Sequence, residues 1–211
     1  MNQFVQSANR MRGRRVIAGL ESRFMEGYYC DTAGEAKALA LSLIGPEELV
    51  AWGGSATLAE LGMREALIQR GQPVLDRTME MTPEQRRQVM RQALTCDAFL
   101  MSANAITLDG ELVNIDGIGN RVAALCFGPK KVIVIAGMNK VAADVPAAMD
   151  RARLYACAAN SIRFGAKTPC AQTGKCTLCK ENSLCAHVVI TRLSQDPGRV
   201  KVILVGESLG F

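Results

Sequence analysis

Two runs of apolar residues constrain the fold of this chain more than any other feature of its sequence. Residues 130–137 read KKVIVIAG and residues 200–206 read VKVILVG. Neither run alternates apolar with polar residues, so neither is typical of a strand with one face in water. Runs of this kind form strands that are buried on both faces of a parallel sheet. Because helical patterns separate them from further apolar segments, the sequence predicts an α/β fold with helices on both faces of an open, mostly parallel sheet.

The remaining pattern supports one domain over residues 1–211, with a helical front end over 1–45 and a cysteine-rich insertion over 166–190. Further strands are predicted at 47–54, 73–76 and 97–106, followed by a hairpin over 107–116 that turns on Asp109-Gly110. Helices are predicted at 3–26, 31–44, 55–71, 82–95, 118–128 and 145–164.

Composition and charge exclude several classes of protein. The net charge is +5, and four arginines near the amino terminus supply much of the excess. Aromatic residues make up only 5% of the chain and no basic stripe is interleaved with them, so a nucleic-acid binder is not expected. The absence of a long apolar run argues against a membrane span. The first residues lack the apolar core of a secretory signal, so we expect a cytoplasmic protein with reduced thiols.

A glycine turn is the first candidate site. In AWGGSATLAELG (51–62), a strand ends at Gly53 and Gly54 and a helix begins at Ser55. Free amides at the start of that helix, together with the hydroxyls of Ser55 and Thr57, could hold a phosphate or a carboxylate. The glycines would let such a ligand approach the backbone. The alternative is an ordinary turn in which Ser55 only caps the helix.

The segment SANAITLDGELVNIDGIGNR (102–121) carries more polar residues than its hairpin needs. Side chains at the carboxyl ends of sheet strands face the crevice where open α/β proteins bind ligands. Asn104, Asn114, Asp116 and Asn120 are therefore predicted to form a wall opposite the glycine turn. The alternative is that they serve turns and helix caps.

Lys140 follows the apolar strand 130–137 and would also lie at a carboxyl end of the sheet. There it could pair with an anionic ligand, or it could be a solvated loop lysine.

Four of the eight cysteines lie close together. Cys170, Cys176, Cys179 and Cys185 have the spacing C-x5-C-x2-C-x5-C, in which four thiolates could bind one metal centre. The spacing matches neither a zinc ribbon nor a ferredoxin, so zinc and an iron–sulfur cluster both stay open. A redox dithiol, or plain buried thiols, are the alternatives. The four other cysteines stand alone in apolar segments and are predicted to be core residues, and His187 is predicted to be structural rather than a fifth ligand.

Several of these motifs resemble the LUD-domain, or lactate-utilisation, family. The resemblance rests on GGSAT, on SANAIT and DGELVNIDGIGNRVAAL, and on CAQTGKC, and it extends from about residue 48 to the end of the chain. It implies a Rossmann-like sheet similar to that of ribose-5-phosphate isomerase, glucosamine-6-phosphate deaminase (NagB-like) and CoA transferases. In those enzymes a glycine turn holds a phosphate or another anion, which would give Gly53, Gly54, Ser55 and Thr57 that role.

The resemblance also implies a function in lactate, or 2-hydroxy acid, utilisation, beside an iron–sulfur protein partner. The isomerases carry an acidic residue where this chain has Asn104, which cannot act as a base. Asp116 is then the nearest carboxylate that could be catalytic. The alternative is a non-catalytic subunit that senses the metabolite or serves as a scaffold, docks the iron–sulfur partner and carries structural zinc. A homo-oligomer is possible in either case.

Overall fold

The structure is a computed structural model that describes residues 2–77 and 80–211. In the described residues the main sheet has the strand order β1-β10-β7-β4-β2-β3, and every neighbouring pair is parallel. Its strands are β1 (Glu26–Cys30), β2 (Val50–Trp52), β3 (Val74–Leu75), β4 (Ala98–Met101), β7 (Lys131–Gly137) and β10 (Val200–Val205). The two apolar runs form the neighbouring central strands β7 and β10. The predicted α/β fold with a mostly parallel sheet is confirmed.

Helices cover both faces of this sheet. The helices of the described residues are α1 (Gln3–Glu21), α2 (Ala33–Ser42), α3 (Ala56–Glu60), α4 (Met63–Gln69), α5 (Pro83–Gln92), α6 (Asn120–Cys126), α7 (Val145–Arg151), α8 (Ala158–Arg163) and α9 (Pro169–Thr173), with short 3-10 turns at Ala93–Thr95 and Met138–Lys140. Apolar residues of α2, α3 and α4 form the core on one face. Those of α1 and α6 pack on the other face. No helix in the described parts of the chain has both the length and the apolar character that a bilayer span requires.

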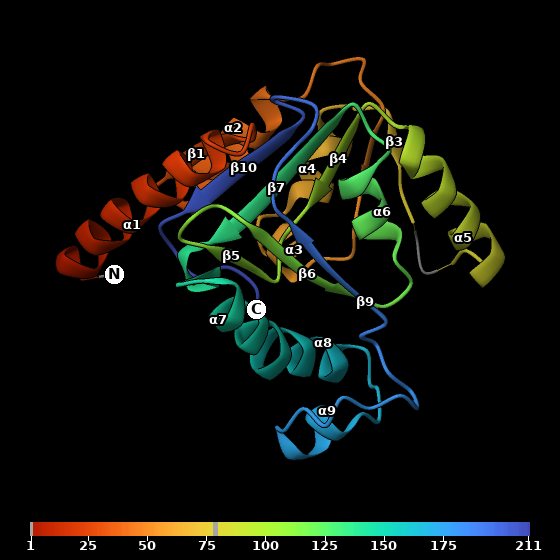
Figure 1. Cartoon of the computed structure of the whole chain (residues 1–211). Helices are drawn as coiled ribbons and strands as arrows, with labels where there is room; N and C mark the ends of the chain where they lie inside the picture. The colour runs from red at the N-terminus through yellow and green to blue at the C-terminus, as the bar shows by residue number, and fades with distance from the viewer. Residues whose placement is uncertain (1, 78–79) are drawn as a thin grey trace.

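A second, smaller sheet packs beside α1 and α6. It has the order β8-β5-β6-β9 and consists of β5 (Ala105–Thr107), β6 (Leu112–Asp116), β8 (Val141–Ala142) and β9 (His187–Thr191). Figure 1 shows its strands crossing those of the main sheet. The inner residues of β5 and β6 join the main core, and their outer residues pack against α7 and the π-helical segment η3 (Ala152–Cys157). The hairpin predicted at Asp109-Gly110 joins β5 and β6.

The strand predicted over 97–106 is wrong in one respect, because it is two strands in different sheets. The chain leaves the main sheet at Met101 and enters the second sheet at Ala105. Asn104 fixes this break: its amide donates to the Val113 carbonyl, and its side-chain oxygen accepts from the Ile115 amide. These bonds draw the backbone toward β6.

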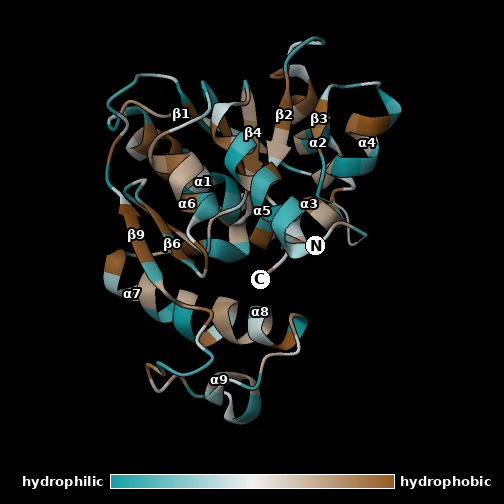
Figure 2. Ribbon diagram, turned by 90° about the vertical axis from the view of Figure 1, so that its right-hand side faces the viewer, coloured by the Kyte–Doolittle hydropathy of each residue, from teal (hydrophilic) through white to brown (hydrophobic). Residues whose placement is uncertain are grey.

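Two strands lie where the sequence predicted other structure. The front end over 1–45 is not wholly helical, because Glu26–Cys30 forms β1, the edge strand that pairs with β10. The cysteine-rich segment ends where β9 begins at His187, so only α9 and a loop lie between α8 and that strand. Both views place α9 at the end of the molecule, beyond α8 (Figures 1 and 2).

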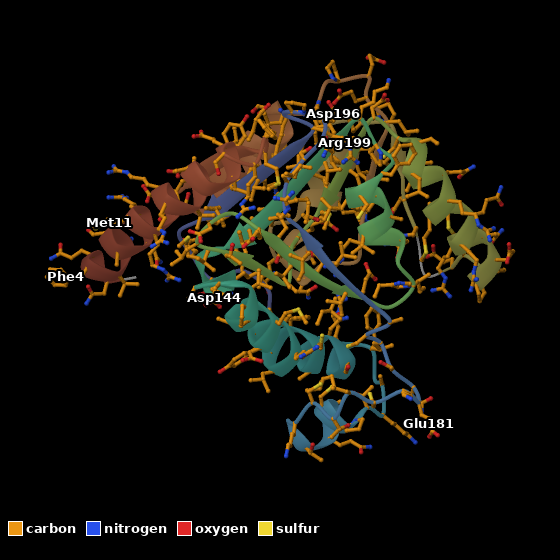
Figure 3. All side chains as sticks on the ribbon, in the orientation of Figure 1. Phe4, Met11, Asp144, Glu181, Asp196 and Arg199 are labelled. Carbon is orange, nitrogen blue, oxygen red and sulfur yellow. The ribbon has the colours of Figure 1, made fainter. Side chains whose placement is uncertain are left out.

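Helix α6 is fixed at its carboxyl end by a partly buried arginine. The Arg199 guanidinium donates to the carbonyls of Ala124, Leu125 and Pro129, which satisfies the carboxyl end of the helix. Figure 3 shows Arg199 at the opposite end of the molecule from the loop that carries Glu181. The amino end of α6 is thereby held toward the carboxyl edge of the main sheet.

Helix α1 docks on the tip of the β5–β6 hairpin through two glycines. A Cβ on Gly19 would lie 2.4 Å from the Asp109 backbone carbon, and a Cβ on Gly110, at φ +88°, would lie 2.5 Å from Gly19. Arg23 donates to the Asp109 carbonyl at 2.7 Å, and Arg15 pairs with the Asp109 carboxylate at 3.1 Å. The two backbones can approach this closely only without side chains between them.

We expect Gly19→Ala to lower the free energy of unfolding by about 1–3 kcal/mol, because the added methyl group meets backbone that cannot move aside cheaply. The matched control is Gly34→Ala in α2, where the nearest atom to the new Cβ is 4.0 Å away. That change should leave stability unchanged or raise it by up to about 1 kcal/mol through helix propensity. Urea unfolding of both variants measures the difference, and equal stabilities would contradict this account of the contact.

Candidate functional site

A cavity of about 660 Å³ lies at the carboxyl edge of the main sheet. Its floor comes from the residues that follow β2, β4 and β7, and β6, α5, α6 and α8 supply its sides. This is the edge at which open parallel sheets bind their ligands. The cavity is large enough for a small metabolite.

The two segments predicted to face each other meet at this cavity. Gly54 and Ser55 line it from the turn after β2, and Asn104, Asp116 and Asn120 line it from the opposite side. Lys140 lines it as well. All six residues come from loops or the ends of elements, and they are up to 86 positions apart in sequence, from Gly54 to Lys140.

Three other predicted residues do not line the cavity. The space above Gly53 is filled by a side chain, because a Cβ there would lie 3.4 Å from the Arg121 Cδ atom. Thr57 is fully buried, and its hydroxyl donates to the Leu209 carbonyl at 3.3 Å. Asn114 is also fully buried, and neither atom of its side-chain amide has a hydrogen-bond partner.

Arg121 holds the wall of the cavity together, although it was not among the predicted site residues. Its guanidinium donates to the carbonyls of Ser102 and Ile115 at 3.2 and 2.9 Å and to the Asn104 side-chain oxygen at 2.9 Å. It also pairs with Asp116 at 3.2 Å. One partly buried cation thus joins the end of β4 to β6. Arg121 is the last residue of the run NIDGIGNR. In the sequence, its positive charge was the only signal that distinguished it from the other polar residues of that run.

Asp116 presents a positioned carboxylate to the cavity. One oxygen accepts from the Gly117 amide at 2.8 Å, and the other accepts from Arg121. Its side chain is only 13% exposed. A carboxylate with two donors keeps further lone pairs, so Asp116 can still accept a hydrogen bond from a ligand. Asp109, in contrast, is 62% exposed and lies outside the cavity with Arg15.

Lys140 is buried between hydroxyl groups rather than beside a carboxylate. Its ammonium group donates to the Thr57 hydroxyl at 2.8 Å and to the Ser102 hydroxyl at 3.0 Å. Burial, together with the smaller effects of the Arg151 and Arg121 charges, lowers the pKa of Lys140 to about 7, against an opposing effect of Glu60. Both protonation states of this lysine are therefore accessible near neutral pH.

Positive charge dominates the cavity. In the described part of the chain six basic side chains line it, against the single carboxylate of Asp116: Arg77, Arg86, Arg87, Arg121, Lys140 and Arg163. Arg163 lies over the rings of Phe164 and Phe211, with 4.6 and 5.8 Å to their centroids. Because helix α3 is only five residues long, these side chains supply most of the field. The arrangement is suited to an anion.

The cysteine-rich segment forms a second cavity, of about 160 Å³. All eight cysteines are free thiols. The four predicted metal ligands line this cavity, together with Cys157 from η3, which was predicted to be a core residue. Across residues 2–77 and 80–211, no three His, Cys, Asp or Glu side chains are placed to hold a metal ion. His187 does not line the cavity and lies against Gly119 instead.

The two cavities are neighbours. Ile115 and Leu184 line both of them, so the cysteine cavity lies directly behind the wall of the basic cavity. Gly117 permits this arrangement, because a Cβ there would lie 3.2 Å from the Leu184 carbonyl oxygen.

Comparisons with known proteins bear on the family and the fold. The family model described as the LUD domain matches residues 13–205. A comparison with curated proteins gives no match. Among solved structures, the chain is similar to a DUF162 family protein from Deinococcus radiodurans, with 14% sequence identity and a TM-score of 0.50. That match covers 95% of this chain and 98% of the other, and at this identity it supports the fold alone.

The lowered pKa of Lys140 predicts a pH-dependent stability. The unfolded lysine binds its proton below about pH 10.5 and the folded one below about pH 7, so the unfolded state holds more protons between these values. Stability should therefore rise with pH across that window. Relative to Lys140→Met, which cannot titrate, the wild-type chain should gain about 2–3 kcal/mol between pH 7 and pH 9.

Urea unfolding at several pH values measures this gain. Lys130→Met is the matched control, because its side chain is largely exposed and pairs only with Asp97 at the surface. A wild-type curve parallel to that of Lys140→Met over this range would show that Lys140 does not titrate there.

Proposed function

The chain belongs to the LUD domain family, which suggests involvement in lactate utilisation, and we propose that its basic cavity binds a small 2-hydroxy or 2-oxo acid. The observation that carries the proposal is the charge of the cavity, where six basic side chains stand against one carboxylate among the described residues. Clefts lined by one sign of charge concentrate ligands of the opposite sign.

The arrangement offers separate partners for the two ends of such a metabolite. A carboxylate is suited to guanidinium groups, which bind it through paired charge-assisted hydrogen bonds. Arg87 and Arg163 line the cavity from α5 and α8 and are assigned to this end. The 2-hydroxyl group would donate to Asp116, whose carboxylate is oriented by Arg121 and the Gly117 amide.

Asp116 is accordingly the proposed general base for any turnover at this site, because it is positioned to accept the proton of the metabolite hydroxyl. Lys140 is assigned to the metabolite oxygens as a hydrogen-bond donor. Ser55, Asn104 and Asn120 supply neutral polar contacts around them. Gly53 and Thr57 are assigned no direct contact with the metabolite: Gly53 lies against the Arg121 side chain, and the Thr57 hydroxyl accepts a hydrogen bond from Lys140.

A non-catalytic sensor or scaffold is the second candidate function. It is favoured by the apolar side chains exposed on η3, α8 and the residue after it: Leu154, Tyr155, Ile162 and Phe164. Exposed apolar side chains that form a contiguous patch are typical of protein interaction surfaces. In this alternative the metabolite controls docking of an iron–sulfur partner protein, and the cysteine segment carries zinc.

We expect lactate and pyruvate to bind the wild-type chain. Arg87→Gln and Arg163→Gln should each weaken this binding by about ten- to a hundredfold, because a charge-assisted hydrogen bond contributes about 1.5–3 kcal/mol. Isothermal titration calorimetry with each acid measures the affinities. Arg91→Gln is the matched control, because Arg91 lies on the same helix as Arg87, is 69% exposed and does not line the cavity. Unchanged affinity in both cavity variants would refute the assignment.

Asp116→Asn should remove a preference for the hydroxy acid. Asp116 can accept a hydrogen bond from the hydroxyl of lactate but meets only a carbonyl oxygen in pyruvate, so the wild-type chain should bind lactate more tightly than pyruvate. The asparagine variant can donate to either oxygen and should bind the two acids with affinities within about threefold of each other. Titrations of both proteins with both acids provide the measurement. A wild-type chain that prefers pyruvate would assign Asp116 a different role.

A further inference from the structure

Five of the eight cysteines surround the cavity of about 160 Å³ at the α8–α9 end of the molecule: Cys157, Cys170, Cys176, Cys179 and Cys185. They come from three parts of the chain, namely the π-helical segment η3, helix α9 and the loop that follows it. The spacing of cysteines in the sequence predicted a site made of only the last four. Cys157 lies 13 positions before Cys170, inside a helical run, and the fold alone brings it to the others.

Two of these thiols are held on helices. Cys157 and Cys170 are both buried, at 7% and 9% exposure. The Cys170 sulfur lies 3.2 Å from the Thr168 hydroxyl and 3.8 Å from that of Ser161. The Cys157 thiol forms a hydrogen bond with Cys185, so the helical group and the loop group are already in contact. Local π-helical turns occur often at functional sites, where they redirect one side chain.

The contact between Cys157 and Cys185 brings one pair of thiols together, but the five thiols as a group do not surround a single ion. A zinc ion needs four sulfurs at roughly 2.3 Å from one point, which places them about 3.8 Å from one another. No set of metal-ligating side chains in the described parts of the chain has such an arrangement. The thiols instead stand around a space similar to the ~150 Å³ cavity that holds a benzene molecule. An iron–sulfur cluster fills a space of this kind, because its own iron and sulfide atoms separate the four thiolates.

The rest of the lining suits a negatively charged cluster. Hydroxyl groups of Ser161, Thr168, Thr177 and Ser183 line the cavity, and so does the Arg153 guanidinium. All of these can donate hydrogen bonds to sulfur. No aspartate or glutamate lines the cavity within the described residues. Donors and positive charge around cluster sulfurs are among the features that adjust its potential.

We infer that this cavity is an iron–sulfur cluster site and that Cys157 is one of its ligands. The inference rests on the proposal that the cysteine segment binds a metal, and it replaces the open choice between zinc and a cluster. It does not depend on what the basic cavity binds.

The test is reconstitution of the full chain with ferrous iron and sulfide under anaerobic conditions. We expect iron and sulfide in equal amounts, together with the visible absorption of a thiolate-ligated cluster. Cys157→Ser should lower bound iron at least tenfold, as Cys176→Ser should. Cys126→Ser, an exposed thiol outside the cavity, and Cys30→Ser, a buried one, should both retain the cluster.

Alkylation of the wild-type chain gives a second readout that needs no variant to fold. Mass spectrometry after iodoacetamide treatment, at a urea concentration where the visible absorption of the cluster persists and with the cluster present or removed beforehand, should show Cys157 protected only when the cluster is retained. Binding of one zinc with no iron and sulfide would overturn the cluster while leaving a metal site. A full cluster in Cys157→Ser, or no protection of Cys157, would overturn its role as a ligand. Failure to bind any metal would overturn both, whereas the lactate titrations would stand.

Discussion

The partly buried guanidinium of Arg121, which is 15% exposed, makes the interaction on which the basic cavity depends. It joins the carbonyl after β4 to the carbonyl near the end of β6, and it orients Asn104 and Asp116 between them. Carbonyl and carboxylate groups that are shielded from water and lack a hydrogen-bond donor would lower the stability of the fold. The Arg121 cation supplies that donor where the two sheets meet, and neither sheet supplies it alone. Gly53 lies next to the same arrangement, because a Cβ there would be in van der Waals contact with the Arg121 side chain at 3.4 Å.

The fold was predictable from the sequence wherever a local residue pattern determines the structure. It was not predictable where the structure depends on a partner segment far away in the sequence. The run KKVIVIAG can hardly be anything other than a doubly buried strand, and it is β7. The segment EGYYC in β1 is mostly half-buried and becomes a strand through pairing with β10, 175 positions later. The break at residues 102–104 likewise depends on β6 and Arg121, so the pattern of 97–106 alone reads as one strand.

The candidate site divides in the same way. Polar residues beyond what a turn needs marked Asn104, Asp116 and Asn120, all of which line the cavity. The arginines of α5 and α8 gave no signal, because arginines on a helix are usually solvated and only the tertiary arrangement turns these toward one space. Cys157 was missed for a similar reason: a single cysteine among alanines is typical of a helix core, and its proximity to Cys185 arises from the return of the loop.

The two cavities are physically linked through the ladder between β6 and β9. Asp116, on the basic cavity, pairs in register with His187, the first residue after the cysteine loop. Leu184 of that loop and Ile115 of β6 form the shared wall. Any change that orders the loop around its thiols therefore also restricts the strand that carries the carboxylate. Linkage between two binding sites is reciprocal. If a ligand of the basic cavity favours one arrangement of this wall, it changes the affinity of the cysteine site for its ligand by some factor. Occupation of the cysteine site then changes the affinity of the basic cavity by the same factor.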